Sequence, residues 1–437
     1  MKWISITYRV ALLAFTVTLA TSAFGQIIDP EEAAKQKAEN RANNKIDNTI
    51  DKGFDKAEET IGNLFKKKDK ASSKDLEEQE DTNSEIDMDE NGNAVAASSG
   101  PKGLVAYSKF DFIPGEKVIA YEDFSQDAVG DFPAKWNSNT SGEVVTIDGS
   151  EGKWLNVSEN GIFYPEFIKD LPENFTLEFE MGYVGDISVN GAGIRLIFAD
   201  KIDNLLRINP YSDRKVVAVS VQPEHQSTSI YTNDADGSRV VENSNGQEIW
   251  TKENPQVKVS IWRQKGRIRM YLDEKKVWDI PRAFDASANY QLVFERDYFY
   301  PGSFFMRNVR LAVGAPDTRS KLITEGKLVT RGITFDVNSA KIKSESYPVL
   351  KDIAAVLTEN PTVKVRIVGH TDSDGNAAAN LALSKSRAVS VATALEDEFG
   401  ITADRLVAEG KGDTEPSEPN TTPQGKANNR RVEFVKL

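Results

Sequence analysis

The spacing of hydrophobic residues changes twice along the 437-residue chain. From residue 30 to residue 69 apolar side chains recur every three or four positions, which is the period of one helical face. From about 103 to 315 the period falls to two, as in strands with one buried face. From 322 to 437 short apolar runs alternate with helical patterns. The pattern predicts a multidomain protein with a helix, an all-β sandwich and an α+β domain in that order.

Alternating residues are clearest in the middle of the chain. Residues 175–181 read Phe-Thr-Leu-Glu-Phe-Glu-Met, which places the apolar side chains on one side of a half-buried strand and Glu178 and Glu180 on the other. Residues 257–272 alternate on both sides of the turn signal Lys265-Gly266 and predict a hairpin. Many short strands with polar loops are typical of a sandwich built from two sheets.

The same segment resembles a known family. The stretch WRQKGRIRMYLDEKKVWDIPRAF at 262–284 and the stretch FFMRNVRLA at 304–312 resemble the penultimate hairpin and final strand of concanavalin-like jelly rolls, and Asp123-Phe124 fits the opening strand. The resemblance implies a jelly-roll fold over 103–315. A retaining glycosidase of this kind needs two carboxylates about 5 Å apart on one strand face. Glu178-Phe-Glu180 lacks the rest of that pattern, so we interpret the sandwich as a binding or spacer module without catalysis.

Strands and helices alternate in the last 116 residues. The predicted order is a strand at 333–335, a helix at 345–359, a strand at 363–368, a helix at 377–399 that Gly400 ends, and closing strands at 406–407 and 432–434. The helices are expected to cover one side of a small sheet, which is an α+β arrangement.

The candidate chemistry lies where the predicted strand at 363–368 ends. The stretch Gly-His-Thr-Asp at 369–372 leads toward a helix on which Asn380, Ser384 and Arg387 share one face. The neighbouring apolar stripe is expected to face the core: Leu381, Ala388, Val391 and Leu395. A fixed carboxylate at Asp372 beside a fixed guanidinium at Arg387 complements a zwitterion. Spacing alone leaves open that the two side chains pair with each other as a structural salt bridge.

This region has a second and more specific resemblance. The stretches GHTDSDGNAAANLALSKSRAVSVATALEDEFGI at 369–401 and RLVAEGKGDTEPSEPNTTPQGKANNRRVEF at 405–434 resemble the OmpA-like peptidoglycan-binding domain, which peptidoglycan-associated lipoproteins and flagellar stator proteins share. The family binds the peptide stem of peptidoglycan at the free amino-acid end of diaminopimelate. The resemblance implies that Asp372 takes the ammonium and Arg387 the carboxylate. It also implies four further pocket residues: Asp336, Thr371, Asn380 and Arg431.

Two positions near these residues call for separate interpretations. The family commonly has an arginine where this chain has Lys426, a change that keeps the charge. His370 lies two positions before Asp372, and the sequence places no nucleophile, metal ligand or second base near it. We therefore expect His370 to be structural.

The amino terminus reads as a targeting segment followed by a tether. Residues 1–25 carry Lys2 and Arg9, an apolar run of about 11 residues and a small-residue cleavage site, which predicts an export signal peptide. An amphipathic helix is expected at 30–69. Residues 70–102 are predicted to be a disordered acidic linker, since 70–100 hold nine acids and two lysines.

Composition excludes several classes of function. The chain has 54 Lys and Arg against 67 Asp and Glu, for a net charge of −13, so it is a poor ligand for nucleic acid. It contains no cysteine and two histidines, which excludes disulfides, a catalytic thiol, a lipid-bearing cysteine and a histidine-built metal centre. We therefore predict no enzyme activity, no cofactor, no metal site and no catalytic residues.

These observations predict an exported protein of the cell envelope on the periplasmic side of the outer membrane. It would bind peptidoglycan noncovalently and tether the wall to that membrane or to an envelope assembly. The alternative is a glycan-binding adhesin whose sandwich is the main actor and whose last domain is the wall anchor. Five of the six tryptophans lie in the sandwich, where we expect them to fill the core. The sandwich's partner, a glycan or an outer-membrane protein, any calcium in it, and the oligomeric state stay open.

Overall fold

The computed structural model describes residues 110–185, 193–200, 203–208, 214–223, 227–297, 302–314 and 317–437. All of them belong to one compact unit of the chain, Ile86–Leu437. The predicted signal peptide at 1–25, helix at 30–69 and linker at 70–102 lie outside the described residues. No helix within the described ranges is long and apolar enough to cross a membrane.

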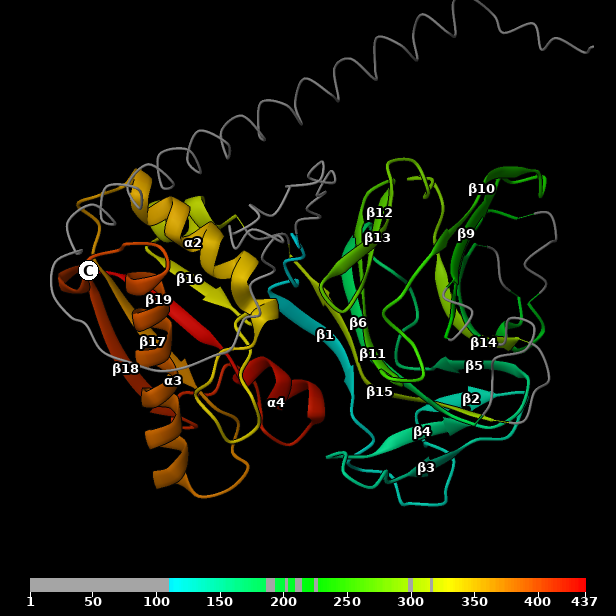
Figure 1. The fold of residues 1–437 in the computed structure, drawn as a ribbon, viewed down its shortest axis with the longest axis horizontal. Helices are drawn as coiled ribbons and strands as arrows, with labels where there is room; N and C mark the ends of the chain where they lie inside the picture. Colours follow the sequence, from blue (N-terminus) through cyan, green and yellow to red (C-terminus); the bar gives the residue numbers. More distant parts are fainter. Residues whose placement is uncertain are drawn as a thin grey trace, which may run out of the picture. The chain divides into compact units, whose positions relative to one another are not determined.

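The first part of the described chain, 110–314, is built almost entirely from strands, and we call it the sheet region (Figure 1). In the described part, one sheet has eight strands: β1 (Lys117–Glu122), β3 (Glu143–Val145), β4 (Trp154–Val157), β6 (Asn174–Val184), β11 (Gln256–Gln264), β12 (Arg267–Leu272), β13 (Lys275–Ile280) and β15 (Ser303–Val313). The other has seven there: β2 (Trp136–Ser138), β5 (Gly161–Pro165), β7 (Gly193–Ala199), β8 (Val216–Gln222), β9 (Ser227–Asn233), β10 (Arg239–Gly246) and β14 (Gln291–Asp297). In the same described part, one short helical turn, η1 (Leu205–Arg207), lies between β7 and β8 of the seven-stranded sheet.

The strand order confirms the predicted β character of this region. The eight-stranded sheet runs β13-β12-β11-β6-β15-β4-β3, with β1 also paired to β15, and the seven-stranded sheet runs β10-β9-β8-β7-β14-β5-β2. Strands β11 and β12 pair antiparallel around Lys265-Gly266, which confirms the predicted hairpin. The jelly-roll identity of the region and the bounds 103–315 remain predictions.

The two sheets share one hydrophobic core. Phe179 on β6 meets Phe294 on β14 edge to face, with ring centroids 5.5 Å apart. Trp136, Trp250 and Trp278 belong to the same core, as expected of large aromatic side chains in a sandwich. Four of the five tryptophans of this region are buried, because Trp154 is also fully covered.

Strand β6 differs from its prediction on one face. Leu177 and Phe179 face the core as expected, but Glu178 on the opposite face is also buried. The C-terminal part of the chain covers that face of the sheet, and the cations Lys258 and Arg310 pair with Glu178 there. The prediction of a half-buried strand is therefore wrong for β6, and the alternating pattern located only its core side.

The last part of the described chain, 317–437, is an α+β region as predicted, and we call it the C-terminal region (Figure 1). Its sheet has the order β16-β19-β17-β18, made of β16 (Lys327–Thr330), β17 (Val365–His370), β18 (Leu406–Gly412) and β19 (Val432–Lys436). The helices are α2 (Tyr347–Glu359), α3 (Ala377–Asp397) and α4 (Pro423–Asn429), with short helical segments η2 (Ser320–Glu325), η3 (Ser344–Ser346) and η4 (Ala403–Arg405). Apolar faces of α2 and α3 form a second core with this sheet.

Two local predictions in this region are wrong. The strand expected at 333–335 is only an isolated bridge from Phe335 to Ile342, because the chain forms its strand earlier, where β16 pairs with β19. A Cβ at Gly332 would lie 2.7 Å from the side chain of Val349, so the chain passes tightly below α2 at this point. Leu381, expected to be in the core, is 48% exposed.

The exposure of Leu381 follows from how α3 sits on the sheet. The helix lies so close to β17 and β18 that a Cβ at Gly369 would be 2.2 Å from the carbonyl oxygen of Ser384. A Cβ at Gly410 would likewise lie 2.4 Å from the backbone nitrogen of Lys385. The glycines thus let the small polar side of α3, with Asn380 and Ser384, be buried against the sheet in place of Leu381.

Candidate functional site

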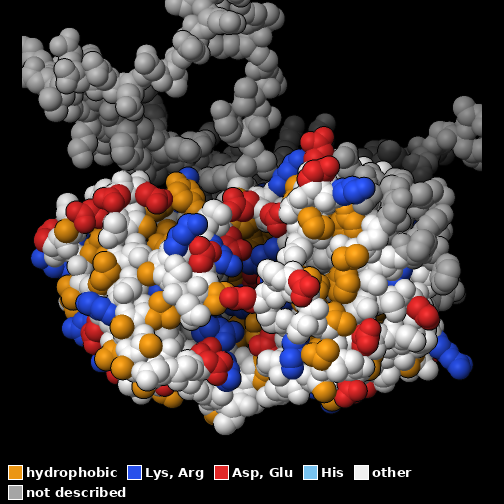
Figure 2. Space-filling model, turned by 60° about the horizontal axis from the view of Figure 1, so that its bottom comes forward, with side chains coloured by type: hydrophobic (Ala, Val, Ile, Leu, Met, Phe, Trp, Pro, Cys, Tyr) orange, Lys and Arg blue, Asp and Glu red, His pale blue; other side chains and the backbone are white. Residues whose placement is uncertain are grey.

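A cavity of about 830 Å³ lies between the sheet region and the C-terminal region. Charged side chains from both regions line it: Asp123, Glu178, Glu180, Lys258, Arg307 and Arg310 from the first, and Arg331, Glu345, Asp372, Arg387, Arg430 and Arg431 from the second. Figure 2 shows a hollowed face on which acidic and basic side chains gather. Groups of both signs in one cavity suit a ligand that carries both charges.

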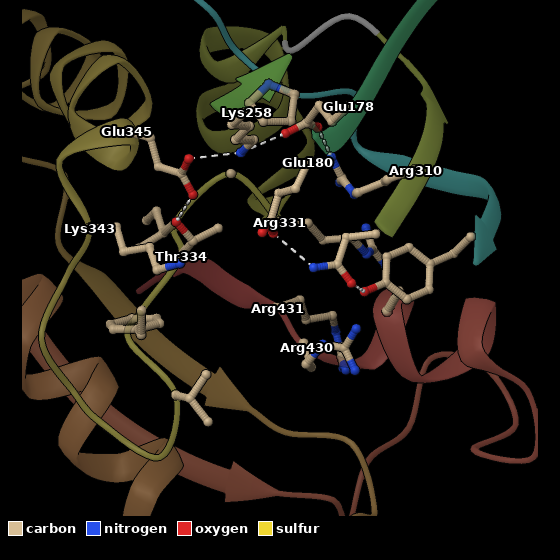
Figure 3. A pocket seen from close by; sticks show the side chains of 18 of the residues that line it. Glu178, Glu180, Lys258, Arg310, Arg331, Thr334, Lys343, Glu345, Arg430 and Arg431 are labelled. Carbon is tan, nitrogen blue, oxygen red and sulfur yellow. Dashed lines mark hydrogen bonds and ion pairs between the residues drawn. The ribbon is translucent and has the colours of Figure 1, made fainter. Parts of the chain in front are cut away.

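Buried contacts between the two regions hold the cavity walls together. Lys258 on β11 reaches Glu178 at 3.0 Å and Glu345 of the C-terminal region at 2.8 Å (Figure 3). The side-chain amide of Asn428 on α4 accepts from the backbone N–H of Val118 at 3.1 Å and donates to its carbonyl at 2.9 Å. We call these five residues the seam. Because the seam joins β1 and β11 to the C-terminal region, it fixes the spacing of the two walls.

The loop after β17 places Thr371 and Asp372 at the cavity. Asn376 begins α3 by accepting hydrogen bonds from the backbone N–H groups of Ala378 and Ala379, as a helix cap does. Asn380, one turn into the helix, donates to the carbonyls of Asp372 at 3.2 Å and Asp374 at 3.0 Å. Asn380 lines the cavity, as its sequence position implied, and its amide holds the loop that carries the carboxylate.

Asp372 is nearly buried and already has one cation beside it. Its Oδ2 accepts from Nη1 of Arg430 at 2.6 Å, and its Oδ1 accepts from the backbone N–H of Asp374 at 3.1 Å. The alternative that spacing left open, a structural salt bridge between Asp372 and Arg387, is therefore wrong. The partner of Asp372 is Arg430, which sequence reasoning did not single out.

Arg387 lines the same cavity without a carboxylate partner among the described residues. Its Nε donates to the carbonyl of Ser339 at 2.9 Å, and its guanidinium lies 4.9 Å from the ring centre of Phe335. Burial lowers the pKa of Arg387, while the negative charge of Asp372 acts in the opposite direction. The two terminal nitrogens make no hydrogen bond within the described residues, so they can receive a carboxylate.

Thr371 supplies a further polar group to the cavity. The residue is 5% exposed, and its hydroxyl oxygen has no hydrogen-bond partner among the described residues. A buried hydroxyl without a partner is uncommon in folded proteins and costs stability. The position beside Asp372 makes this hydroxyl available to a ligand that enters the cavity.

The other two residues that the family resemblance implied have different surroundings. Asp336 lines a neighbouring cavity and lies 3.5 Å from the ammonium of Lys341, with its side chain 45% exposed. Arg431 lines the main cavity, but its Nε donates to Glu433 at 2.9 Å and its Nη2 to the carbonyl of Glu415 at 3.0 Å. The structure thus brings Thr371, Asp372, Asn380, Arg387 and Arg431 to one cavity and leaves Asp336 beside it.

Several lining residues were not found from sequence. Arg430 lies 5.7 Å above the ring of Tyr121, which comes from β1 of the sheet region. The hydroxyl of Tyr121 donates to Asn308 at 3.2 Å, and the amide of Asn308 donates to Glu180 at 2.8 Å. The Arg430-Arg431 doublet was visible, but only the structure shows which arginine meets Asp372. No local sequence pattern marks the cavity residues of the sheet region, because only tertiary packing brings them to the cavity.

Two other features concern chemistry at this site. His370 is buried, with its Nε2 3.7 Å from Glu433, which also pairs with Lys327 at 2.7 Å. Within the described ranges, no group of three or more histidine, aspartate or glutamate side chains could hold a metal ion.

Comparison with known proteins identifies part of the chain. Residues 334–430 match the protein-family model described as OmpA family. The probable lipoprotein YiaD of Escherichia coli is 44% identical over 103 residues, which are 24% of this chain and 47% of that protein. Outer membrane porin F of Pseudomonas aeruginosa is 37% identical over 111 residues, which are 25% of this chain and 32% of the porin. The peptidoglycan-binding protein ArfA of Mycobacterium tuberculosis is 38% identical over 108 residues, or 24% of this chain and 33% of ArfA.

These relatives share one domain with the chain. The match spans less than half of the length of each of the three. Among solved structures, the peptidoglycan-associated lipoprotein from Burkholderia pseudomallei is 28% identical and covers 24% of this chain and 88% of its own, with a TM-score of 0.23. That score is too low to support an argument about the fold. The family match therefore rests on sequence and covers residues 334–430 only.

Proposed function

We propose that the protein binds peptidoglycan noncovalently at the cavity that holds Asp372 and Arg387, because residues 334–430 match the OmpA family model. One observation carries the proposal: a partly buried guanidinium, Arg387, has no carboxylate partner among the described residues and shares a cavity with the carboxylate of Asp372. The name of ArfA describes a peptidoglycan-binding protein and supports the same ligand for this domain.

The ligand group is the free amino-acid end of diaminopimelate in the peptide stem. Asp372 receives its ammonium through Oδ1, which keeps a lone pair beside the bond from Asp374, while Arg430 stays on Oδ2. Arg387 receives the carboxylate through its two terminal nitrogens, the fork that suits a carboxylate. Thr371 adds its hydroxyl. Asn380 acts as a positioning residue for the loop.

Two residues have indirect roles in this proposal. Arg431 already donates to Glu433 and to the carbonyl of Glu415, so we assign it a role in shaping the cavity and no hydrogen bond to the ligand. Asp336 lies outside the main cavity, in the lining of the neighbouring one, and we assign it no direct contact with the ligand. The proposed binding needs neither a catalytic group nor a cofactor.

Binding of the peptide stem at a single site would be weak and reversible. Charge-assisted hydrogen bonds contribute about 1.5–3 kcal/mol each, and association costs offset much of the total from two or three of them. The wall repeats the same stem at high density, so weak sites can still hold the protein in place. We propose that the exported chain thereby links the wall to the outer membrane or to an envelope assembly, with the sheet region facing the second partner.

Cosedimentation of the full chain with purified, protein-free sacculi tests the proposal. We expect Asp372→Asn and Arg387→Gln to abolish cosedimentation while the circular dichroism spectrum stays unchanged. Asp404→Asn and Arg366→Gln are matched controls, because both side chains are exposed, form surface ion pairs and lie away from the cavity. Wild-type cosedimentation in both site variants would show that the pocket assignment is wrong.

The adhesin alternative gains no support from the sheet region. A sugar-stacking site would need exposed tryptophans, but Trp136, Trp154, Trp250 and Trp278 are all less than 5% exposed, and Trp262 is partly buried. The adhesin alternative would move ahead if the wild-type chain failed to bind sacculi and was retained on a polysaccharide column.

A further inference from the structure

Figure 3 labels four of the six arginines that line the cavity, and three of these four have a carboxylate partner. Arg310 pairs with Glu178, Arg430 with Asp372 and Arg431 with Glu433. Figure 3 shows Arg331 among these three side chains. Among the described residues, Arg331 has no carboxylate in ion-pair contact. Charges that are removed from water are normally paired, so this exception needs a reason.

The guanidinium of Arg331 is held in place by backbone carbonyls. Its Nε donates to the carbonyl of Asn428 at 3.0 Å, and its Nη1 donates to the carbonyl of Glu116. Asn428 belongs to the C-terminal region and Glu116 to the sheet region, so the two bonds orient the guanidinium from both sides. The remaining terminal nitrogen, Nη2, makes no hydrogen bond within the described residues. The group is thus fixed in orientation with one donor edge unused.

The electrostatic surroundings of Arg331 favour an anion. Burial, followed by the positive charges of Arg310 and Arg431, lowers the pKa of Arg331 to about 10. An anion that bound to the unused edge would relieve this repulsion. The negative charges of Glu418 and Glu116 act in the opposite direction but are outweighed, and neither carboxylate is in ion-pair contact with Arg331.

We propose that Arg331 forms a second carboxylate subsite, which receives another carboxylate of the same peptide whose zwitterionic end binds Asp372 and Arg387. This inference rests on the proposed function. The cavity volume of about 830 Å³ is at the upper end of ligand pockets and leaves room for more than one amino-acid end. Arg331 lies three residues before the segment that matches the family model, and the sheet region helps to orient it. The subsite therefore belongs to this pairing of regions.

The experiment uses the stem tripeptide alanyl-γ-glutamyl-diaminopimelic acid, synthesised with the glutamyl α-carboxyl either free or as its amide. Calorimetry measures the binding of both peptides to the full chain and to Arg331→Gln. Glutamine keeps an amide donor for the carbonyls of Asn428 and Glu116 but removes the charge. Arg319→Gln is the matched control, since Arg319 is exposed and far from the cavity lining.

We expect amidation to weaken binding to the wild type by about tenfold, the lower end for one charge-assisted hydrogen bond. Arg331→Gln should bind the free acid about tenfold more weakly and should no longer distinguish the two peptides. Arg319→Gln should behave as the wild type.

Three results would overturn the subsite. Equal binding of both peptides to the wild type would overturn the subsite by itself, before any variant is measured. If Arg331→Gln distinguished the free acid from the amide as well as the wild type does, the carboxylate would bind elsewhere. If the variant bound both peptides more weakly by the same factor, Arg331 would only connect the two backbone carbonyls and would not contact the ligand. Failure of the wild type to bind either peptide or free diaminopimelate would instead overturn the proposed function, and the subsite with it.

Discussion

The arginines on the two walls of the cavity are held in different ways. On the sheet wall, Arg307 and Arg310 each pair with a glutamate of β6. On the C-terminal wall, Arg430 and Arg431 also pair with carboxylates, but Arg387 and Arg331 donate to backbone carbonyls and meet no carboxylate within the described residues. A carbonyl orients a guanidinium but leaves its charge uncompensated. The comparison indicates that paired charges on the sheet wall serve stability, while carbonyl-held charges on the other wall are available for binding.

The largest expected effect tests the stabilising role of the paired charges. Lys258→Met leaves two largely buried carboxylates, Glu178 and Glu345, without their shared cation. Removing one partner of a buried pair should lower the free energy of unfolding by about 3 kcal/mol. Urea denaturation measures the change. Lys364→Met, which breaks an exposed pair with Asp404, should cost under about 1 kcal/mol, and equal effects of the two variants would contradict the assignment.

A somewhat smaller loss should follow when the neutral part of the seam is removed. Asn428→Ala removes the side-chain partner of the buried backbone N–H of Val118 and leaves its carbonyl with the long hydrogen bond from Gln424 at 3.5 Å. The expected cost is about 2 kcal/mol of unfolding free energy, the penalty for unsatisfied buried polar groups. The matched control is Asn360→Ala, whose side chain donates to a helix carbonyl outside the seam. No difference from this control would mean that ion pairs alone join the two regions.

Acid should reduce the difference between Lys258→Met and the wild type. Burial acts to raise the pKa of Glu178, but the charges of Lys258 and Arg310 lower the pKa overall, and the pKa of Glu345 is lowered as well despite burial. Carboxyls with a lowered pKa stabilise the fold above their ordinary value of 4.5, and that stability is lost as the pH falls through the lowered pKa. The wild type should therefore lose stability below about pH 4.5, whereas the variant, without Lys258, should lose less.

Denaturation curves of the two proteins between pH 7 and pH 3 measure this convergence. A gap that stays constant with pH would show that Lys258 stabilises the protein through packing of its aliphatic chain and not through its charge.

The smallest expected effect concerns the wall that we assign to binding. Arg387→Gln should change the free energy of unfolding by less than about 1 kcal/mol, because no ion pair is broken and burying an uncompensated charge is itself costly. The same variant should lose binding to sacculi. A loss of several kcal/mol in urea denaturation would instead make Arg387 a structural residue like Arg310.

Short-range patterns determined much of this molecule from sequence alone. The hairpin at 257–272 and the helix at 377–397 follow from residue periodicity, because a strand repeats every two residues and a helix every 3.6. The family motif placed Thr371, Asp372, Asn380 and Arg387, and the strand, loop and helix that carry them are consecutive in the chain. Local geometry therefore brings these side chains to one cavity.

Only the tertiary structure decided which charges are paired. Glu178 looked like a solvent-facing residue until the C-terminal region covered β6, and Asp372 found Arg430, 58 positions away. Arg331 lies 215 positions from Glu116, whose carbonyl orients it. Ion pairs and hydrogen bonds over such separations leave no periodic trace in the sequence, because they depend on how whole sheets and helices pack and not on the backbone geometry of neighbouring residues.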